Sequence, residues 1–165
     1  TFGQSTIWKF NNNASAMKSK LAARDFEDLL QCSIPVFDGL MPTTSENNII
    51  LDLLWDECAW HALAKLLLHT ETTLHIFDKT TVSLGNSLQQ FSRQVAGRYY
   101  TTELPQKEAA RGQRHAALVK KAIKKIGGKA KPFNLDTCKL HSLGDYAAAI
   151  HMFGTTDNYT TQIVS

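Results

Sequence analysis

Apolar residues recur every three or four positions along most of the chain, a spacing that aligns them on one face of a helix. The first such stretch covers residues 14–37, and Pro35 is expected to end or kink that helix. A second helix is expected over residues 46–69, with Ser45 as its N-cap. Apolar residues lie nearly all round this second helix, which is typical of the centre of a helical bundle.

The clearest pattern predicts a third, long helix from residue 71 to residue 100, with Thr70 as its N-cap. Its apolar face alternates spacings of three and four residues for three heptads, which keeps a narrow seam against a partner helix. The seam consists of Leu74, Phe77, Thr81, Leu84, Leu88, Phe91 and Val95. Three heptads is the minimum for an intermolecular coiled coil, so a partner helix within the same chain is favoured.

Leu104 and Pro105 mark a boundary, after which residues 106–126 are mostly strong helix formers. The pair Gly127-Gly128 is expected to end that helix, and residues 129–132 to form an exposed connector. A last helix is expected over residues 136–153, with Asp136 or Thr137 as its N-cap and Gly154 as its C-cap. A polar turn over residues 155–158 follows.

Together these elements predict an all-α fold, an irregular bundle of four or five helices with a long central helix and a basic helix or linker. Residues 1–104 are expected to form the helical core, residues 105–132 the basic helix and linker, and residues 133–165 a C-terminal helix and polar turn that pack on the core. The pattern predicts no regular strand. The predicted core contains Leu30, Leu54, Trp60, Leu63, Leu67, Phe77, Leu84, Leu88 and Phe91.

Composition narrows the class of protein further. The 165 residues, 43% of them hydrophobic, are enough for one domain with a sizeable core. The richest apolar stretch, residues 49–68, also carries acidic and basic side chains, so it predicts a buried helix and no membrane contact. Three cysteines without metal-ligand spacing favour reduced thiols in an intracellular compartment. The first residue, Thr1, is not Met, so the chain is expected to be a fragment.

Charge is distributed unevenly along the chain. The formal net charge is +3, yet residues 107–131 alone hold nine basic residues and one Glu, a local balance of +8. Such a cluster favours binding to the phosphate backbone of nucleic acid, independent of base sequence. Its composition also resembles that of a nuclear-import signal. The candidate nucleic-acid-binding residues are Lys107, Arg111, Arg114, Lys120, Lys121, Lys124, Lys125, Lys129 and Lys131. A solvated linker helix is the alternative, and the segment has no aromatic residue for base stacking.

No complete catalytic or metal-binding set is evident. The chain lacks a phosphate loop, a nucleophile elbow and two histidines spaced as in metalloproteases. His141 and His151 are ten positions apart on the last predicted helix, too far to share a metal. Asp145 and Asp157 are candidate acids, but an exposed helix residue and an Asx-type turn former are the favoured explanations of the two. We therefore expect no cofactor and no metal site.

Two strings, residues 21–42 and 139–161, resemble the C-terminal region of proteins encoded by fungal (basidiomycete) DNA transposons, the Plavaka-like and related transposase families. The resemblance extends to residues 59–66, 69–71, 103–105 and 108–111. The motif residues that carry it near the C-terminus are His141, Gly144, Asp145, Tyr146, Gly154, Thr155, Asp157 and Asn158.

The resemblance implies a helical portion of a longer transposase whose ribonuclease H-like site would need divalent metal ions. In some of these families a Glu follows the string that resembles residues 153–161, whereas this chain ends in Gln162-Ile163-Val164-Ser165. We therefore expect a non-catalytic fragment that binds nucleic acid in the nucleus, with the remainder of a longer transposase or a helical protein as a further partner. A helical interaction or scaffold module without nucleic-acid binding is the alternative, and the oligomeric state is left open.

Overall fold

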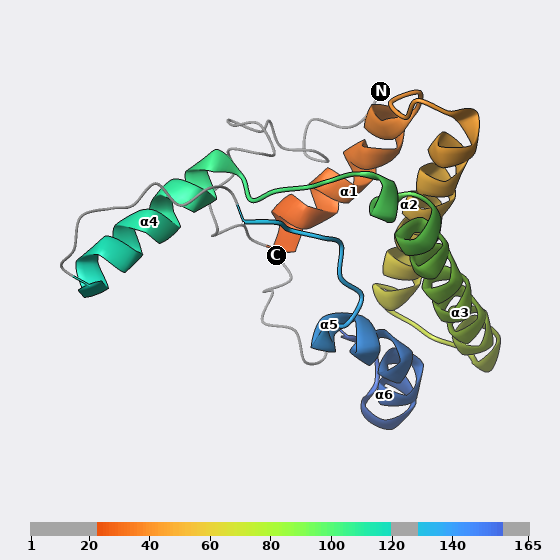
Figure 1. The fold of residues 1–165 in the computed structure, drawn as a ribbon. Coiled ribbons are helices and arrows are strands. Elements are labelled where there is room, and N and C mark those ends of the chain that lie inside the picture. The colour runs from red at the N-terminus through yellow and green to blue at the C-terminus, as the bar shows by residue number, and fades with distance from the viewer. Residues whose placement is uncertain (1–22, 120–128, 157–165) are drawn as a thin grey trace, which may run out of the picture.

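The structure is a computed structural model that describes residues 23–119 and 129–156. Its fold is all-α, an irregular bundle with one helix standing apart, as the sequence pattern predicts (Figure 1). The elements in chain order are α1 (Ala23–Phe37), α2 (Thr44–Ala64), α3 (Glu71–Gln94), the 3₁₀ helix η2 (Ala96–Arg98), α4 (Pro105–Val119), α5 (Cys138–His141), the 3₁₀ helix η3 (Ser142–Asp145) and α6 (Tyr146–Phe153).

The centre of the bundle is the contact between α2 and α3, onto which α1 and the C-terminal helices pack. Phe77 on α3 is fully buried, and its ring lies 5.3 Å from the indole of Trp60 on α2. The Trp60 indole N–H donates to Thr81 Oγ1 at 2.9 Å, so this buried donor is satisfied across the helix pair. Tyr146 of α6 meets Trp60 edge-on at 4.8 Å and closes the core from the third side.

The seam of α3 packs within the chain, which confirms the intramolecular prediction. Leu74, Phe77 and Leu84 are buried in the main cluster, while Leu88 and Phe91 pack against it half-buried. Thr70 is the N-cap of α3, also as predicted, and its side chain and that of Thr73 form a reciprocal capping box. The helix ends at Gln94 instead of Tyr100, because the chain tightens there into η2.

The second helix differs from its prediction at both ends. Thr43, not Ser45, is the N-cap of α2, since its hydroxyl accepts from the Glu46 amide at 3.2 Å. The helix ends at Ala64 instead of His69, where the chain turns back into α3. Leu67 is consequently 75% exposed in the connection, so its place in the predicted core is wrong. Trp55 is 67% exposed, so the described residues leave this position on the outer face of α2 uncovered.

The first and last helices also depart from expectation. Pro35 lies in the last turn of α1 without ending it, because a proline there removes only one intrahelical hydrogen bond. Residues 14–22 of the first predicted helix lie outside the described residues. The last predicted helix is divided into α5, η3 and α6 around Ser142 and Gly144, both weaker helix formers. Thr137 is the N-cap of α5, one of the two predicted caps.

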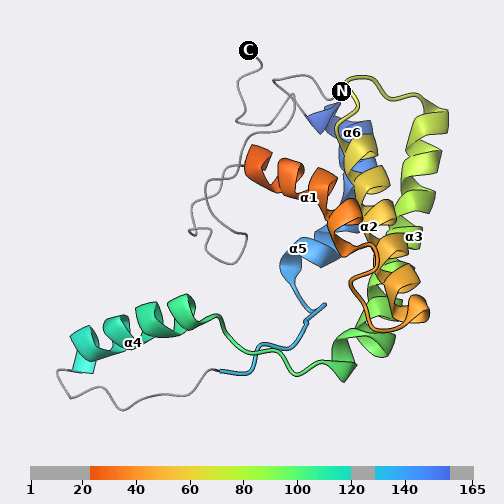
Figure 2. The ribbon, with the colours of Figure 1, turned by 90° about the horizontal axis from the view of Figure 1, so that it is seen from above.

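Residues 101–103 and 129–131 lie side by side and form a neck, from which α4 extends as an arm. The isolated antiparallel bridge joins Thr102 and Ala130. The Glu103 amide donates to the Lys129 carbonyl at 2.8 Å, and the Lys131 amide to the Thr101 carbonyl at 2.9 Å. Figures 1 and 2 show α4 directed away from the bundle in both views. After the neck, Phe133 meets the Phe91 ring edge-on at 5.0 Å, which ties the returning chain to α3.

Candidate functional site

The arm carries the first of the predicted basic residues. Lys107 is exposed in the first turn of α4, and Arg111 follows one turn later. Arg114 also lies on α4, but its side chain is not among those that the structure describes. The placement of Lys107 leaves its ammonium group in solvent, where it is accessible to an anion.

Arg111 has a partner that the charge count along the sequence did not reveal. Its Nε donates to Glu103 Oε2 at 3.0 Å, and both side chains are partly buried. Its Nη2 is buried without a hydrogen-bond partner among the described residues. The pair spans eight positions across Pro105, a spacing that no helix would bring together. It becomes apparent only once the neck fixes Glu103 beside the start of the arm.

The neck places two more predicted residues. Lys129 and Lys131 are exposed, and both contribute backbone groups to the antiparallel pairing. Residues two apart in an extended strand direct their side chains to the same side. The two ammonium groups are therefore expected on one side of the neck, at the base of the arm. Lys120, Lys121, Lys124 and Lys125 lie outside the described residues.

The C-terminal motif residues named from the sequence are spread over positions with different surroundings. Tyr146 packs on Trp60, and Gly154 ends α6 with a φ of 86°, a conformation that favours glycine. Thr155 is half-buried, while Gly144 and Asp145 are exposed in η3. The His141 imidazole lies 3.3 Å from the Asp136 carboxylate on the surface. Asp157 and Asn158 lie outside the described residues.

No group of three or more His, Cys, Asp or Glu residues in the described ranges is arranged to hold a metal ion. Within the same ranges, no helix is both long and apolar enough to cross a membrane. The described motif residues that pack most closely, Tyr146 and Gly154, serve the fold: one closes the core and the other ends a helix.

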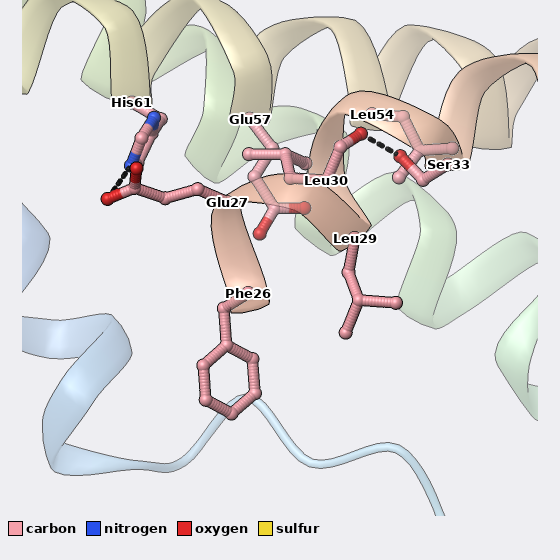
Figure 3. Close-up of a pocket in the computed structure, with 8 residues that line it drawn as sticks. All are labelled: Phe26, Glu27, Leu29, Leu30, Ser33, Leu54, Glu57 and His61. Atoms are coloured by element: carbon pink, nitrogen blue, oxygen red, sulfur yellow. Dashed lines mark hydrogen bonds and ion pairs between the residues drawn. The ribbon is translucent and has the colours of Figure 1, made fainter. Parts of the chain in front are cut away.

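An open groove between α1 and α2 was not predicted (Figure 3). Its volume is about 510 Å³, and its lining is mostly apolar. The lining residues are Phe26, Glu27, Leu29, Leu30, Ser33, Leu54, Glu57 and His61. At one end, Glu27 Oε1 lies 2.7 Å from Lys65 Nζ and 3.7 Å from His61 Nε2. Glu57 and His61 are one turn apart on α2, but only the crossing of α1 converts that face into a groove.

The groove shifts the pKa values of Glu57 and His61 in opposite directions, and both shifts favour the uncharged form. Burial raises the pKa of Glu57, which disfavours its carboxylate form. Burial also lowers the pKa of His61, although the nearby Glu27 carboxylate opposes that shift. His61 is therefore largely neutral near pH 7. Both shifts follow from the apolar lining, which solvates charge poorly.

Outside the groove, the carboxylate of Glu46 has a structural role. Its side chain is buried, and Arg98 Nη1 donates to its Oε1 at 2.6 Å across 52 positions of sequence. The hydroxyl of Tyr99 donates to Oε2 at 3.3 Å. The hydrogen bond from Arg98 is the main cause that lowers the pKa of Glu46. This cluster joins the start of α2 to the chain that leaves α3 for the neck.

Comparison of the chain with family models, with curated proteins and with solved structures finds no match.

Proposed function

We propose that this chain is a helical portion of a transposable-element protein and that its arm and neck bind the phosphate backbone of nucleic acid. The observation that carries the proposal is the position of the described part of the basic segment, residues 107–119 and 129–131. Its helix projects from the bundle on a two-stranded neck instead of packing on it (Figures 1 and 2). Lys107, Lys129 and Lys131 are exposed along this projection.

Lysine is suited to this contact because its ammonium group is a point charge on a flexible stem. Binding to phosphates releases condensed counterions, so the affinity falls steeply with salt and depends little on base sequence. The basic segment also has the composition of a nuclear-import signal, so a nuclear location belongs to the same proposal.

The Arg111–Glu103 pair modifies the contribution of the arm. The carboxylate already neutralises Arg111, so this residue should contribute less to phosphate binding than the exposed lysines. Replacing the carboxylate in Glu103→Gln should release the guanidinium and strengthen binding. The slope of log affinity against log salt should then steepen by about one unit.

The test is fluorescence anisotropy with the 165-residue chain and two labelled duplexes of unrelated sequence, across a range of salt concentrations. Four to six phosphate contacts predict a slope of about −4 to −5 for both duplexes. The double variant Lys129→Gln/Lys131→Gln should flatten the slope by up to about two units. Replacing Lys120, Lys121, Lys124 and Lys125 with Gln should flatten it by up to about four.

A matched control removes two exposed lysines of the bundle, Lys79→Gln and Lys139→Gln, and should leave the slope unchanged. The proposal fails if no duplex binds at low salt. It also fails if the neck variant and the control variant lose affinity equally.

A second candidate function is a helical interaction module, favoured by apolar side chains at one end of the bundle. Leu67 and Leu68 in the connection after α2 and Met152 and Phe153 at the end of α6 are all more than 65% exposed. Thr156 Oγ1 donates to the Ala64 carbonyl at 2.8 Å and so brings these two chain segments together. Self-association in sedimentation velocity that Leu67→Ser/Leu68→Ser abolishes, without DNA binding, would favour this function instead.

A further inference from the structure

The groove between α1 and α2 has an apolar surface that the described residues leave open to solvent. Leu30 and Leu54 come from the two helices and form its half-buried part, while Phe26 stands at the rim with 57% of its surface exposed. Figure 3 shows the Phe26 ring directed away from the body of α1 and not inserted between the helices. The volume of about 510 Å³ lies in the range of small-molecule sites.

The two carboxylates of the groove differ in their partners. Glu27 is paired with Lys65 and also lies near His61, so its charge is compensated. Glu57 is an exposed residue of the lining, and the described part of the chain provides it with neither a cation nor a hydrogen-bond donor as partner. An apolar groove with one uncompensated carboxylate offers a ligand both apolar contact and a site for one positive charge.

We propose that this groove binds a small organic cation, with its apolar body against Phe26, Leu30 and Leu54 and its ammonium group paired with the Glu57 carboxylate. An anion is disfavoured by two carboxylates in the lining. A neutral apolar molecule would fill the groove but would make no ion pair with the Glu57 carboxylate, which only solvent would then contact. An amine with a short aromatic or aliphatic body satisfies both parts of the lining.

The raised pKa of Glu57 supports this assignment, because a bound cation would favour the carboxylate and return its pKa toward the ordinary value. Of the titratable groups that line the groove with Glu57, Glu27 lies on α1 and His61 on α2. Cys58 follows Glu57 on α2, and Lys65, just beyond the end of α2, pairs with Glu27. The ammonium group of the ligand stays charged well above neutral pH, and Lys65 remains paired with Glu27. Binding should therefore weaken as the pH falls and Glu57 becomes protonated.

The experiment uses the 165-residue chain and two probes of nearly equal shape, 2-phenylethylammonium and its neutral counterpart 2-phenylethanol. Titrations are followed by the amide and side-chain carboxyl resonances of the protein in NMR. We expect the ammonium probe to bind roughly tenfold more tightly than the alcohol, the range of one charge-assisted hydrogen bond. Its saturation should lower the pKa of Glu57, and the shifted amides should cluster in α1 and α2.

Three variants locate the site. Glu57→Gln should bring the affinity for the ammonium probe down to that for the alcohol. Phe26→Ala, at an exposed rim position that should tolerate the change, should weaken both probes. Asp52→Asn removes an exposed carboxylate of the same helix outside the groove and should change neither. The far-ultraviolet circular dichroism of each variant shows whether it has folded.

Two results would overturn the inference. Equal affinity of the two probes would show that the groove does not select for positive charge. Retention of ammonium binding in folded Glu57→Gln would place the cation elsewhere, with Glu27 as the next residue to replace. Neither result depends on DNA binding by the arm, so the nucleic-acid proposal stands or falls separately.

Discussion

Helix α3 and helix α4 are both amphipathic, yet the structure uses them in opposite ways. The 24-residue α3 buries leucine and phenylalanine side chains against α2, and its seam holds the bundle together. The 15-residue α4 is rich in alanine and basic residues and extends into solvent. Alanine favours the helical backbone but offers little area to bury. Helix α3 is therefore stabilised mainly by packing, whereas α4 depends mainly on the intrinsic helix propensity of its residues.

The largest effect should come from the buried face of α3. Replacing the fully buried Phe77 with alanine removes its contact with Trp60 and leaves a cavity, at an expected cost of about 3–5 kcal/mol in unfolding free energy. Urea unfolding measures this loss. Tyr100→Ala, at a residue 83% exposed beyond η2, is the control and should cost less than about 0.5 kcal/mol. Similar losses for both variants would contradict the assignment of the core.

A smaller effect tests the polar contact inside the same helix pair. Thr81→Val removes the acceptor of the buried Trp60 indole N–H and should cost about 1–3 kcal/mol. Thr80→Val is the matched control, since the Thr80 hydroxyl donates to the Ile76 carbonyl of its own helix. The difference between the two variants in urea unfolding isolates the contact between helices. If they are equally stable, the indole has found another partner.

The smallest expected effect on the bundle comes from the arm. Ala109→Gly lowers the helix propensity of α4 by about 1 kcal/mol locally. Because the arm projects from the bundle, the global unfolding free energy should change by less than about 0.5 kcal/mol. Hydrogen exchange should nevertheless accelerate at the α4 amides alone. A shift of the global unfolding transition by the full 1 kcal/mol would show that arm and bundle unfold together.

The parts of the fold that were predictable depend on spacing within one helix. The α3 seam and the Thr70 cap follow from local rules that need no knowledge of neighbouring elements. The end of α2 was predicted five residues late, because Leu66, Leu67 and Leu68 continue its apolar pattern. Burial of those residues depends on where the chain must turn to pair α3 with α2. Periodicity alone does not contain that requirement.

The candidate sites were predictable to different extents. The basic segment is visible as a local charge excess, but its pairing of Arg111 with Glu103 depends on the neck. The groove was not predicted at all, since Glu57 and His61 carry no signal until α1 crosses α2 beside them. To predict a site formed by two elements that are distant in sequence, one must know the angle at which these elements pack. That angle is set by the packing of the whole bundle.

The neck also has a consequence for how chain length can vary. Because residues 103 and 129 are already joined by a hydrogen bond of 2.8 Å, everything between them leaves and returns at one place. Lengthening a closed loop changes its closure entropy only slowly, by about 0.6 kcal/mol for each doubling. Insertions or deletions between these two residues should therefore alter the reach of the arm and leave the bundle largely intact. We therefore expect that the segment between residues 103 and 129 can be replaced by one of another length while the helical bundle still folds.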